Sequence, residues 1–253
     1  MVVAAGWATP WAFRPGGGHG PVMATPDASF VVPARNEVDY IDATLASIGS
    51  QTTARPYEVV VADGDSTDGT RSVARRHGAA VVREGGHSIA SGRNRGAAAA
   101  AGEWLAFVDA DTTLAPEYLE RMLAFADREG LAAASSRCRI AGPRRAKAME
   151  WTINHAFPRL SAPILPGFNT VVRREAFERV GGFPEVPNED TAFSRRLGRR
   201  APTAYHPATL VTTSGRRVAD AGLTGTLLHY LRLDVRRLRG PGRPAGAPVG
   251  DAD

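Results

Sequence analysis

The sequence predicts an α/β fold with a mostly parallel central sheet and helices on both of its faces. Short β-branched or apolar runs alternate with segments of helical periodicity through the first half of the chain, and this alternation is typical of βαβ units. Three acidic loops stand out, each after a predicted strand or before a predicted helix, and open α/β sheets bind ligands at the carboxyl ends of their strands. The 253 residues suffice for one substantial core, so we expect one domain with irregular ends.

Composition agrees with a soluble globular protein, because 43% of the residues are hydrophobic and 23% are charged. The net charge of +5 comes from arginine, since Lys147 is the only lysine. Between Ser214 and Arg243 the sequence contains seven arginines and only two acidic residues, Asp220 and Asp234. This excess suggests a phosphate-bearing substrate or an anionic membrane surface, and a solvated helix face explains most of these arginines equally well. We expect no nucleic-acid partner.

Cysteine content and hydropathy limit the location of the protein. Cys138 is the only cysteine, so no disulfide can form within one chain, and we interpret Cys138 as a thiol of the core. No run approaches the ~20 apolar residues of a membrane span, and the N-terminus lacks the pattern of a signal peptide. We therefore expect a cytoplasmic location.

The predicted elements of the first half follow from local patterns. Residues 1–27 are rich in Gly, Pro and Ala and are predicted to be a disordered extension. Periodicity, turn formers and helix-terminating glycines then predict strands at 29–33, 57–62, 79–82 and 105–109, with helices at about 41–48, 73–77 and 88–101.

The second half is less regular. Pro116 begins a helix that reaches about Arg128, and residues 142–165 combine a helix containing Trp151 with a proline-bounded loop. The remaining predictions are strands at 131–139, 169–173 and 208–213 and helices at 175–180, 189–199 and 223–238, followed by a disordered tail over 240–253.

The strongest local signal is the pair Asp109 and Asp111, which follows a buried apolar run. Carboxylates at positions i and i+2 beyond a strand can both turn toward one cation, and hard divalent ions prefer oxygen ligands. The alternative is that both aspartates cap the following turn, but their position after a buried strand favours a ligand site.

Six motifs together resemble the family 2 glycosyltransferases, which have the GT-A fold, a Rossmann-like α/β architecture. Their order and spacing carry the resemblance, which covers roughly residues 28–215, the expected domain. The motifs are Val32-Pro33-Ala34-Arg35-Asn36-Glu37, Asp63-Gly64-Asp65-Ser66-Thr67-Asp68-Gly69-Thr70, Arg93-Asn94-Arg95-Gly96, Asp109-Ala110-Asp111, Gly181-Gly182-Phe183 and Glu189-Asp190.

The resemblance implies a binding site for a nucleoside-diphosphate sugar. Asp63 resembles the residue that accepts a hydrogen bond from the base, whereas Asp65 is displaced by one position from the usual second aspartate, and Asp68 is interpreted as a turn residue. Arg93 resembles a basic residue near the diphosphate, and a surface arginine is an equally good alternative. The residues expected to bind the donor are Pro33, Ala34, Arg35, Glu37, Asp63, Asp65, Arg93, Asp109 and Ala110.

The resemblance also implies a metal and a catalytic base. Asp109 would face the ribose and Asp111 would bind Mg²⁺ or Mn²⁺, which would neutralise charge on the departing diphosphate. Asp190 would take the proton of the acceptor hydroxyl during transfer with inversion, and Glu189 would orient the acceptor. The acidic pair also suits the start of a helix, which is compatible with catalysis.

The pocket for the sugar or acceptor and the C-terminal region are less well determined. Gly167 and Phe168 are expected to form the floor of that pocket. His206 is interpreted as structural, whereas Arg216 and Arg217 are weak candidates for phosphate contact. The helix in the predicted C-terminal region 216–239 carries an apolar stripe, which would pack on the domain or dock on the inner face of a membrane.

These observations predict an inverting, metal-dependent glycosyltransferase that uses a nucleoside-diphosphate sugar and a hydroxyl acceptor, either lipid-linked or a precursor of a cell-surface glycan. A nucleotidyltransferase of the same fold is one alternative, but it would normally have a Gly-rich basic loop after the first strand. A sugar-nucleotide-binding protein is the other, and the presence of both Asp111 and Asp190 argues against it.

Overall fold

A computed structural model describes residues 25–86, 88–144 and 146–216. The predicted helix over 223–238 and both predicted disordered ends, apart from residues 25–27, lie outside these ranges. The described strands are β1 (Ala28–Ala34), β2 (Tyr57–Asp63), β3 (Ala80–Arg83), β4 (Trp104–Phe107), β5 (Thr112–Leu114), β6 (Ala133–Ala141), β7 (Thr170–Arg173) and β8 (Thr203–Ser214). The described helices are α1 (Ile41–Gly49), α2 (Thr70–Arg76), α3 (Ile89–Ala99), α4 (Tyr118–Arg128), α5 (Ala146–Trp151), α6 (Arg174–Arg179) and α7 (Glu189–Gly198).

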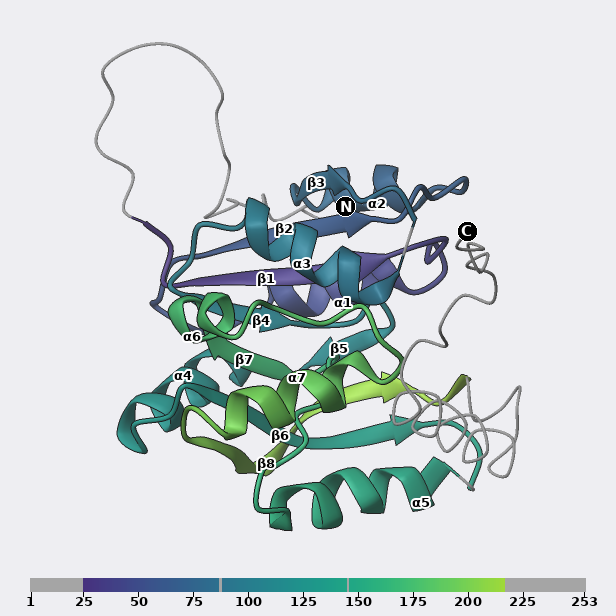
Figure 1. Cartoon of the computed structure of the whole chain (residues 1–253). Coiled ribbons are helices and arrows are strands. Elements are labelled where there is room, and N and C mark those ends of the chain that lie inside the picture. Colours follow the sequence, from purple (N-terminus) through teal and green to yellow (C-terminus); the bar gives the residue numbers. More distant parts are fainter. Residues whose placement is uncertain (1–24, 87, 145, 217–253) are drawn as a thin grey trace, which may run out of the picture.

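The described strands form one eight-stranded sheet in the order β3-β2-β1-β4-β7-β6-β8-β5 (Figure 1). β1 is parallel to β2 and β4, and β2 is parallel to β3. β7 is antiparallel to both of its neighbours, β4 and β6, so β6 runs in the same direction as β4. β8 is parallel to β6, and β5 pairs antiparallel with β8. The predicted mostly parallel sheet is therefore confirmed, with β7 and β5 reversed.

Helices cover both faces of the sheet, as predicted. Successive side chains of β1 alternate between two cores, because Phe30 and Val32 join one cluster and Val31 joins the other. The first core includes residues of α1, α2, α4 and α5, and the second includes residues of α3, α6 and α7. Cys138 is buried in the first core, and burial raises the pKa of its thiol to about 12.

Several boundaries differ from the sequence prediction. β4 ends at Phe107, two residues before Asp109, and the short strand β5 was not predicted because it is fixed only by pairing with the distant β8. β8 begins at Thr203 rather than near Ala208, because an irregularity in its pairing with β6 accommodates Pro207, which has no backbone N–H to donate. The segment after α5 continues as a π-helical turn, Thr152–Ala156, and a 3₁₀ turn, Phe157–Arg159.

The packing of α3 on β1 depends on Gly96. A Cβ atom at Gly96 would lie 2.4 Å from Cγ1 of Val31, which is fully buried and cannot move aside. The glycine of the Arg-Asn-Arg-Gly motif therefore allows the close approach that fixes Arg93 over the sheet.

We predict that Gly96→Ala lowers the free energy of unfolding by about 1–3 kcal/mol, the usual cost of overpacking a core. Gly49→Ala is the matched control, since nothing lies within 4 Å of a Cβ atom there, and its better helix propensity should leave stability equal or slightly higher. Urea denaturation of both variants measures the difference. Equal midpoints would contradict the close approach of α3.

Candidate functional site

Loops from both halves of the chain meet at one edge of the sheet. This is the edge at which the parallel strands end, on the right in Figure 1. Asp63 ends β2, Asp109 follows β4, and Arg216 follows β8, and these three strands run in the same direction. β7 runs in the opposite direction and pairs Thr170 with Phe107, so the loop that precedes it, with Gly167, reaches the same edge. The topology therefore brings most of the predicted site residues together.

Arg93 is the central side chain of this edge. It projects from α3, is only 2% exposed, and donates from Nη2 to Oδ1 of Asp109 at 2.8 Å and from Nη1 to Oε1 of Glu189 at 2.6 Å. Its guanidinium lies 5.2 Å from the centre of the Phe183 ring, within the range of a cation–π contact. Arg93 is thus not a surface arginine, because it joins the loop after β4 to the start of α7.

Gly167 and Asn94 maintain the surroundings of Arg93. A Cβ atom at Gly167 would lie 2.4 Å from Cζ of Arg93, so only glycine permits this packing. Asn94 donates from Nδ2 to the carbonyl of Phe183 at 2.8 Å and accepts from the Phe183 N–H at 2.9 Å. Phe168, the second predicted floor residue, is half-buried and packs against the first core.

Asp190 lies beside this arginine in the first turn of α7. Its carboxylate accepts from the N–H of Thr191 at 2.6 Å and more weakly from the N–H of Gly167 at 3.4 Å. Although the residue is partly exposed, the protein surrounds its carboxylate, and this desolvation raises its pKa. The neighbouring Glu189 also raises the pKa, and Arg93 opposes both effects. A carboxylate with a raised pKa suits a general base.

Asp109 and Asp111 have different partners. Asp109 is held by Arg93, whereas Oδ2 of Asp111 lies 3.1 Å from Nε of Arg216. Ala110, between them, is buried, and its carbonyl accepts from the hydroxyl of Thr44 at 2.8 Å. The two carboxylates thus belong to separate ion-pair networks.

Arg216 joins the second network to the loop after β1. Its Nη1 donates to Oε2 of Glu37 at 2.7 Å and its Nη2 donates to Oε1 of Glu37 at 2.5 Å, which makes the pair bidentate. The guanidinium also lies 4.7 Å from the centre of the Tyr40 ring. The Glu37 pair is the main cause that raises the pKa of Arg216, so this side chain stays charged.

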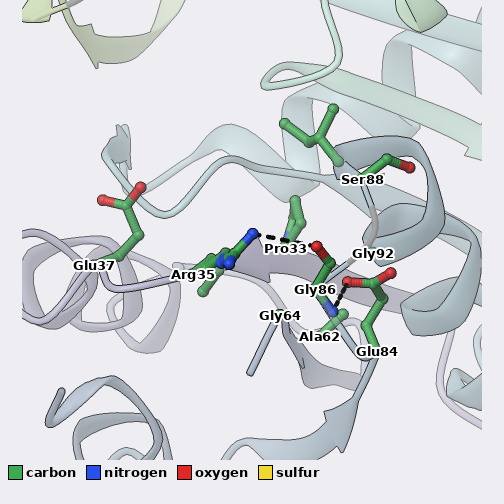
Figure 2. Close-up of a pocket in the computed structure, with 11 residues that line it drawn as sticks. Pro33, Arg35, Glu37, Ala62, Gly64, Glu84, Gly86, Ser88 and Gly92 are labelled. Carbon is green, nitrogen blue, oxygen red and sulfur yellow. Dashed lines mark hydrogen bonds between the residues drawn. The ribbon is translucent and has the colours of Figure 1, made fainter. Parts of the chain in front are cut away.

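A pocket opens beside the carboxyl ends of β1 and β2 (Figure 2). Arg35 lies across it and donates from Nη1 to the carbonyl of Gly86 at 3.2 Å. Glu84 follows β3 and accepts from the N–H of Gly86 at 2.9 Å. The lining includes four residues predicted to bind the donor, Pro33, Ala34, Arg35 and Glu37, and Gly64 of the second motif. It also includes Glu84, Gly86 and Ser88, which the sequence analysis does not identify.

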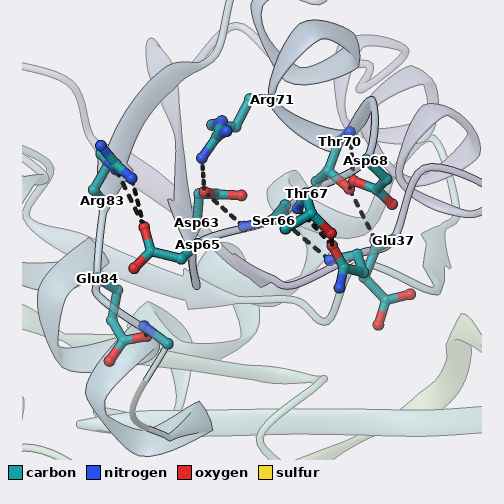
Figure 3. Close-up of polar contacts among 12 residues, drawn as sticks. Glu37, Asp63, Asp65, Ser66, Thr67, Asp68, Thr70, Arg71, Arg83 and Glu84 are labelled. Carbon is teal, nitrogen blue, oxygen red and sulfur yellow. Dashed lines mark hydrogen bonds and ion pairs between the residues drawn. The ribbon is translucent and has the colours of Figure 1, made fainter.

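The loop after β2 holds Asp63 in a buried position (Figure 3). Oδ2 of Asp63 accepts from Arg71 at 3.0 Å and from the N–H of Ser66 at 3.2 Å. Its Oδ1 is buried and has no hydrogen-bond partner among the described residues. Buried polar atoms are rarely left unpaired, so this oxygen is a candidate acceptor for a ligand.

Asp65 and Asp68 take other roles in the same loop. Asp65 has a left-handed backbone with φ of 56° and pairs with the exposed Arg83 at 2.8 Å (Figure 3). Asp68 accepts from the N–H of Thr70 at 2.9 Å and from that of Val38 at 3.2 Å, as a turn residue does. Asp65 is not among the residues that line the pocket.

The acidic residues at this edge of the sheet could bind a divalent cation through a single carboxylate. The described residues contain no group of three or more His, Cys, Asp or Glu side chains that could hold a metal. Mg²⁺, however, is often held by one or two carboxylates and by substrate phosphates, and Asp111 could serve as such a single ligand. His206 does not extend this set, because it packs against Phe125, its Nδ1 accepts from the N–H of Ala208, and burial lowers its pKa.

Known proteins share this fold. The structure aligns with S. aureus TarS in complex with UDP-GlcNAc at a TM-score of 0.64 and 21% identity, over 75% of this chain and 59% of that chain. It aligns with the mannosyltransferase PcManGT from Pyrobaculum calidifontis, in complex with GDP-Man and Mn²⁺, at a TM-score of 0.63 and 24% identity, over 88% and 67% of the two chains. These likenesses confirm the predicted GT-A fold. Among the described residues, no helix is long and apolar enough to cross a membrane.

Sequence relatives agree. A validoxylamine A glucosyltransferase of Streptomyces hygroscopicus is 38% identical over 112 residues, which cover 42% of this chain but only 26% of that relative. Glycosyltransferase AglE of Haloferax volcanii is 28% identical over 185 residues, 68% of this chain and 61% of AglE. The family model for glycosyl transferase family 2 matches residues 29–181, more than half of the chain. The chain therefore belongs to glycosyltransferase family 2.

Proposed function

We propose that this chain is an inverting, metal-dependent glycosyltransferase that moves a sugar from a nucleoside-diphosphate sugar to a hydroxyl acceptor. The observation that carries this proposal is the double ion pair of Arg93. It holds Asp109, in the loop after β4, and Glu189, next to Asp190, against one guanidinium. A donor group and an acceptor group are therefore fixed relative to each other, which transfer between two bound substrates requires.

The nucleotide would occupy the pocket beside β1 and β2. The unpaired Oδ1 of Asp63 offers an acceptor for an N–H of the base, Asp109 would face the ribose, and Arg35 would approach the phosphates. TarS and PcManGT were solved with UDP-GlcNAc and GDP-Man, which supports a sugar nucleotide as the donor class.

Asp111 is the residue we assign to a divalent metal. A bound Mg²⁺ or Mn²⁺ would supply neutralisation of the charge that develops on the departing nucleoside diphosphate. The Mn²⁺ in the PcManGT complex supports this assignment. Both carboxylates pair with an arginine, but the partner of Asp109 is the buried Arg93, whereas the partner of Asp111 is the partly exposed Arg216, so Asp109 is the less suitable of the two.

Asp190 is the residue we assign to the acceptor. Its raised pKa makes its carboxylate a better proton acceptor than an ordinary aspartate. It would remove the proton of the acceptor hydroxyl as that oxygen attacks the anomeric carbon from the face opposite the diphosphate. Glu189 would orient the acceptor, and Gly167 and Phe168 would form the floor of its pocket. We propose a lipid-linked acceptor or a precursor of a cell-surface glycan.

The catalytic base Asp190 distinguishes this proposed enzyme from a sugar-nucleotide-binding protein, which would not need it. We predict that Asp190→Asn lowers transfer about 100-fold or more, with little effect on nucleotide binding. Asp111→Asn should lower both transfer and binding of nucleoside diphosphate with Mn²⁺. Release of nucleoside diphosphate from a panel of UDP- and GDP-sugars measures transfer, and Asp42→Asn, at an exposed carboxylate, is the control. Unchanged transfer in both variants would refute the proposal.

Stability provides a second readout for Asp190→Asn. Because the folded-state pKa of Asp190 is raised, this group stabilises the fold below its unfolded pKa, and that contribution is lost as pH rises through the folded pKa. The charged carboxylate therefore destabilises the fold at pH values above the folded-state pKa. The variant should unfold at an equal or higher temperature there, so lost transfer would not reflect lost folding.

Arg93 is proposed as a positioning residue that also sets the pKa of Asp190. Because Arg93 lowers that pKa, we predict that Arg93→Gln moves the acidic limb of the kcat/KM profile to higher pH and lowers its maximum. Arg93→Lys keeps the charge but cannot bridge two carboxylates as a planar guanidinium does. The maximum of its kcat/KM profile should therefore fall, with a smaller shift of the acidic limb than in Arg93→Gln. Arg95→Gln, on the exposed face of α3, is the control. An unshifted limb in Arg93→Gln would contradict this role.

A further inference from the structure

Arg216 occupies the position where Asp111 and the loop after β1 approach each other. Its guanidinium contacts carboxylates with all three of its nitrogens, Nη1 and Nη2 on Glu37 and Nε on Asp111. The side chain reaches them from just after the end of β8. The backbone there is tied to Asp111, because the N–H of Ser214 donates to the carbonyl of Asp111 at 3.2 Å. Glu37 lies 179 residues away in the sequence and lines the nucleotide pocket.

This arrangement places a fixed positive charge at the carboxylate proposed to bind metal. The side chain of Asp111 is 12% exposed and that of Arg216 is 31% exposed, so water screens the pair only in part. A divalent cation on Asp111 would lie close to the guanidinium, and like charges at such a distance repel each other. The cation therefore competes with Arg216 for Asp111.

A diphosphate would change this balance. Its oxygens offer a guanidinium the same bidentate geometry that Glu37 offers, and an arginine binds planar pairs of acceptor oxygens well. Arg216 is close to the pocket because its partner Glu37 lines that pocket. Loss of the Asp111 contact would then be offset by a phosphate contact.

We propose that Arg216 is the resident counter-cation of the donor site: it pairs with Asp111 and Glu37 in the free protein and moves from Asp111 to the donor phosphates when a metal-bearing nucleotide binds. This inference rests on the proposed function, because it assumes a diphosphate ligand. Its consequence is an order of binding. The metal alone binds weakly, and the nucleotide makes its site available.

Binding of Mn²⁺ without nucleotide tests the first half of the inference. The free-ion signal in electron paramagnetic resonance reports Mn²⁺ binding independently of turnover. Arg216→Gln should raise the affinity for Mn²⁺ alone by about five- to tenfold, because a repelling charge is removed. Arg216→Lys keeps the charge and should stay near the original protein. Asp111→Asn should abolish the gain when combined with Arg216→Gln.

Binding of UDP and GDP in the presence of Mn²⁺, measured by calorimetry, tests the second half. Arg216→Gln should lower the affinity for the nucleotide about tenfold or more, since a charge-assisted contact to phosphate is lost. Arg179→Gln, an exposed arginine in α6, is the matched control and should change neither affinity. Thermal unfolding of each variant confirms that it is folded, and Arg216→Ala, which also removes the charge, replaces Arg216→Gln if that variant is not folded.

The outcomes separate the inference from the proposed function. If Arg216→Gln leaves the affinity for Mn²⁺ alone unchanged, the exchange at Asp111 is refuted, even where nucleotide affinity falls. If the nucleotide affinity is also unchanged, Arg216 is a structural tie only. If the original protein binds neither UDP nor GDP with Mn²⁺, the proposed function itself fails.

Discussion

The burial of one guanidinium is the constraint on which the rest of the site depends. An arginine that is 2% exposed must be paired, because an unpaired buried charge is costly. Asp109 and Glu189 meet that requirement, and Gly167 and Phe183 leave the guanidinium just enough room. The loop after β4, the loop before β7 and the first turn of α7 therefore take their positions from Arg93, although they come from distant parts of the chain.

The parts of the fold that follow from local pattern could be predicted from the sequence. The β-branched run before Pro33 and the helical spacing of Ile41, Leu45 and Ile48 identify elements that the structure contains. Pairing between distant segments could not be predicted this way. β5 exists only through its register with β8, and Pro207 concealed the first half of β8 because proline is unusual inside a strand.

The same limit applies to the site. The residue types and their order identified Asp63, Arg93, Asp111 and Asp190 as candidates, and the structure places them along one edge of the sheet. Their partners could not be predicted, because Arg93 and Glu189 are 96 residues apart and Arg216 and Glu37 are 179 apart. An acidic residue after a predicted strand was an available signal for Glu84, and it was overlooked because no motif contains it.

The reversed direction of β7 separates two parts of the architecture. β1, β2 and β3 shape the nucleotide pocket through the loops that follow them, whereas β7 contributes the loop that precedes it. The segment between β6 and β7 can therefore change in length and composition while the pairing of the nucleotide-side strands stays intact. In an evolving lineage, such a division lets residues 142–165 change while the pocket beside β1 and β2 is inherited unchanged.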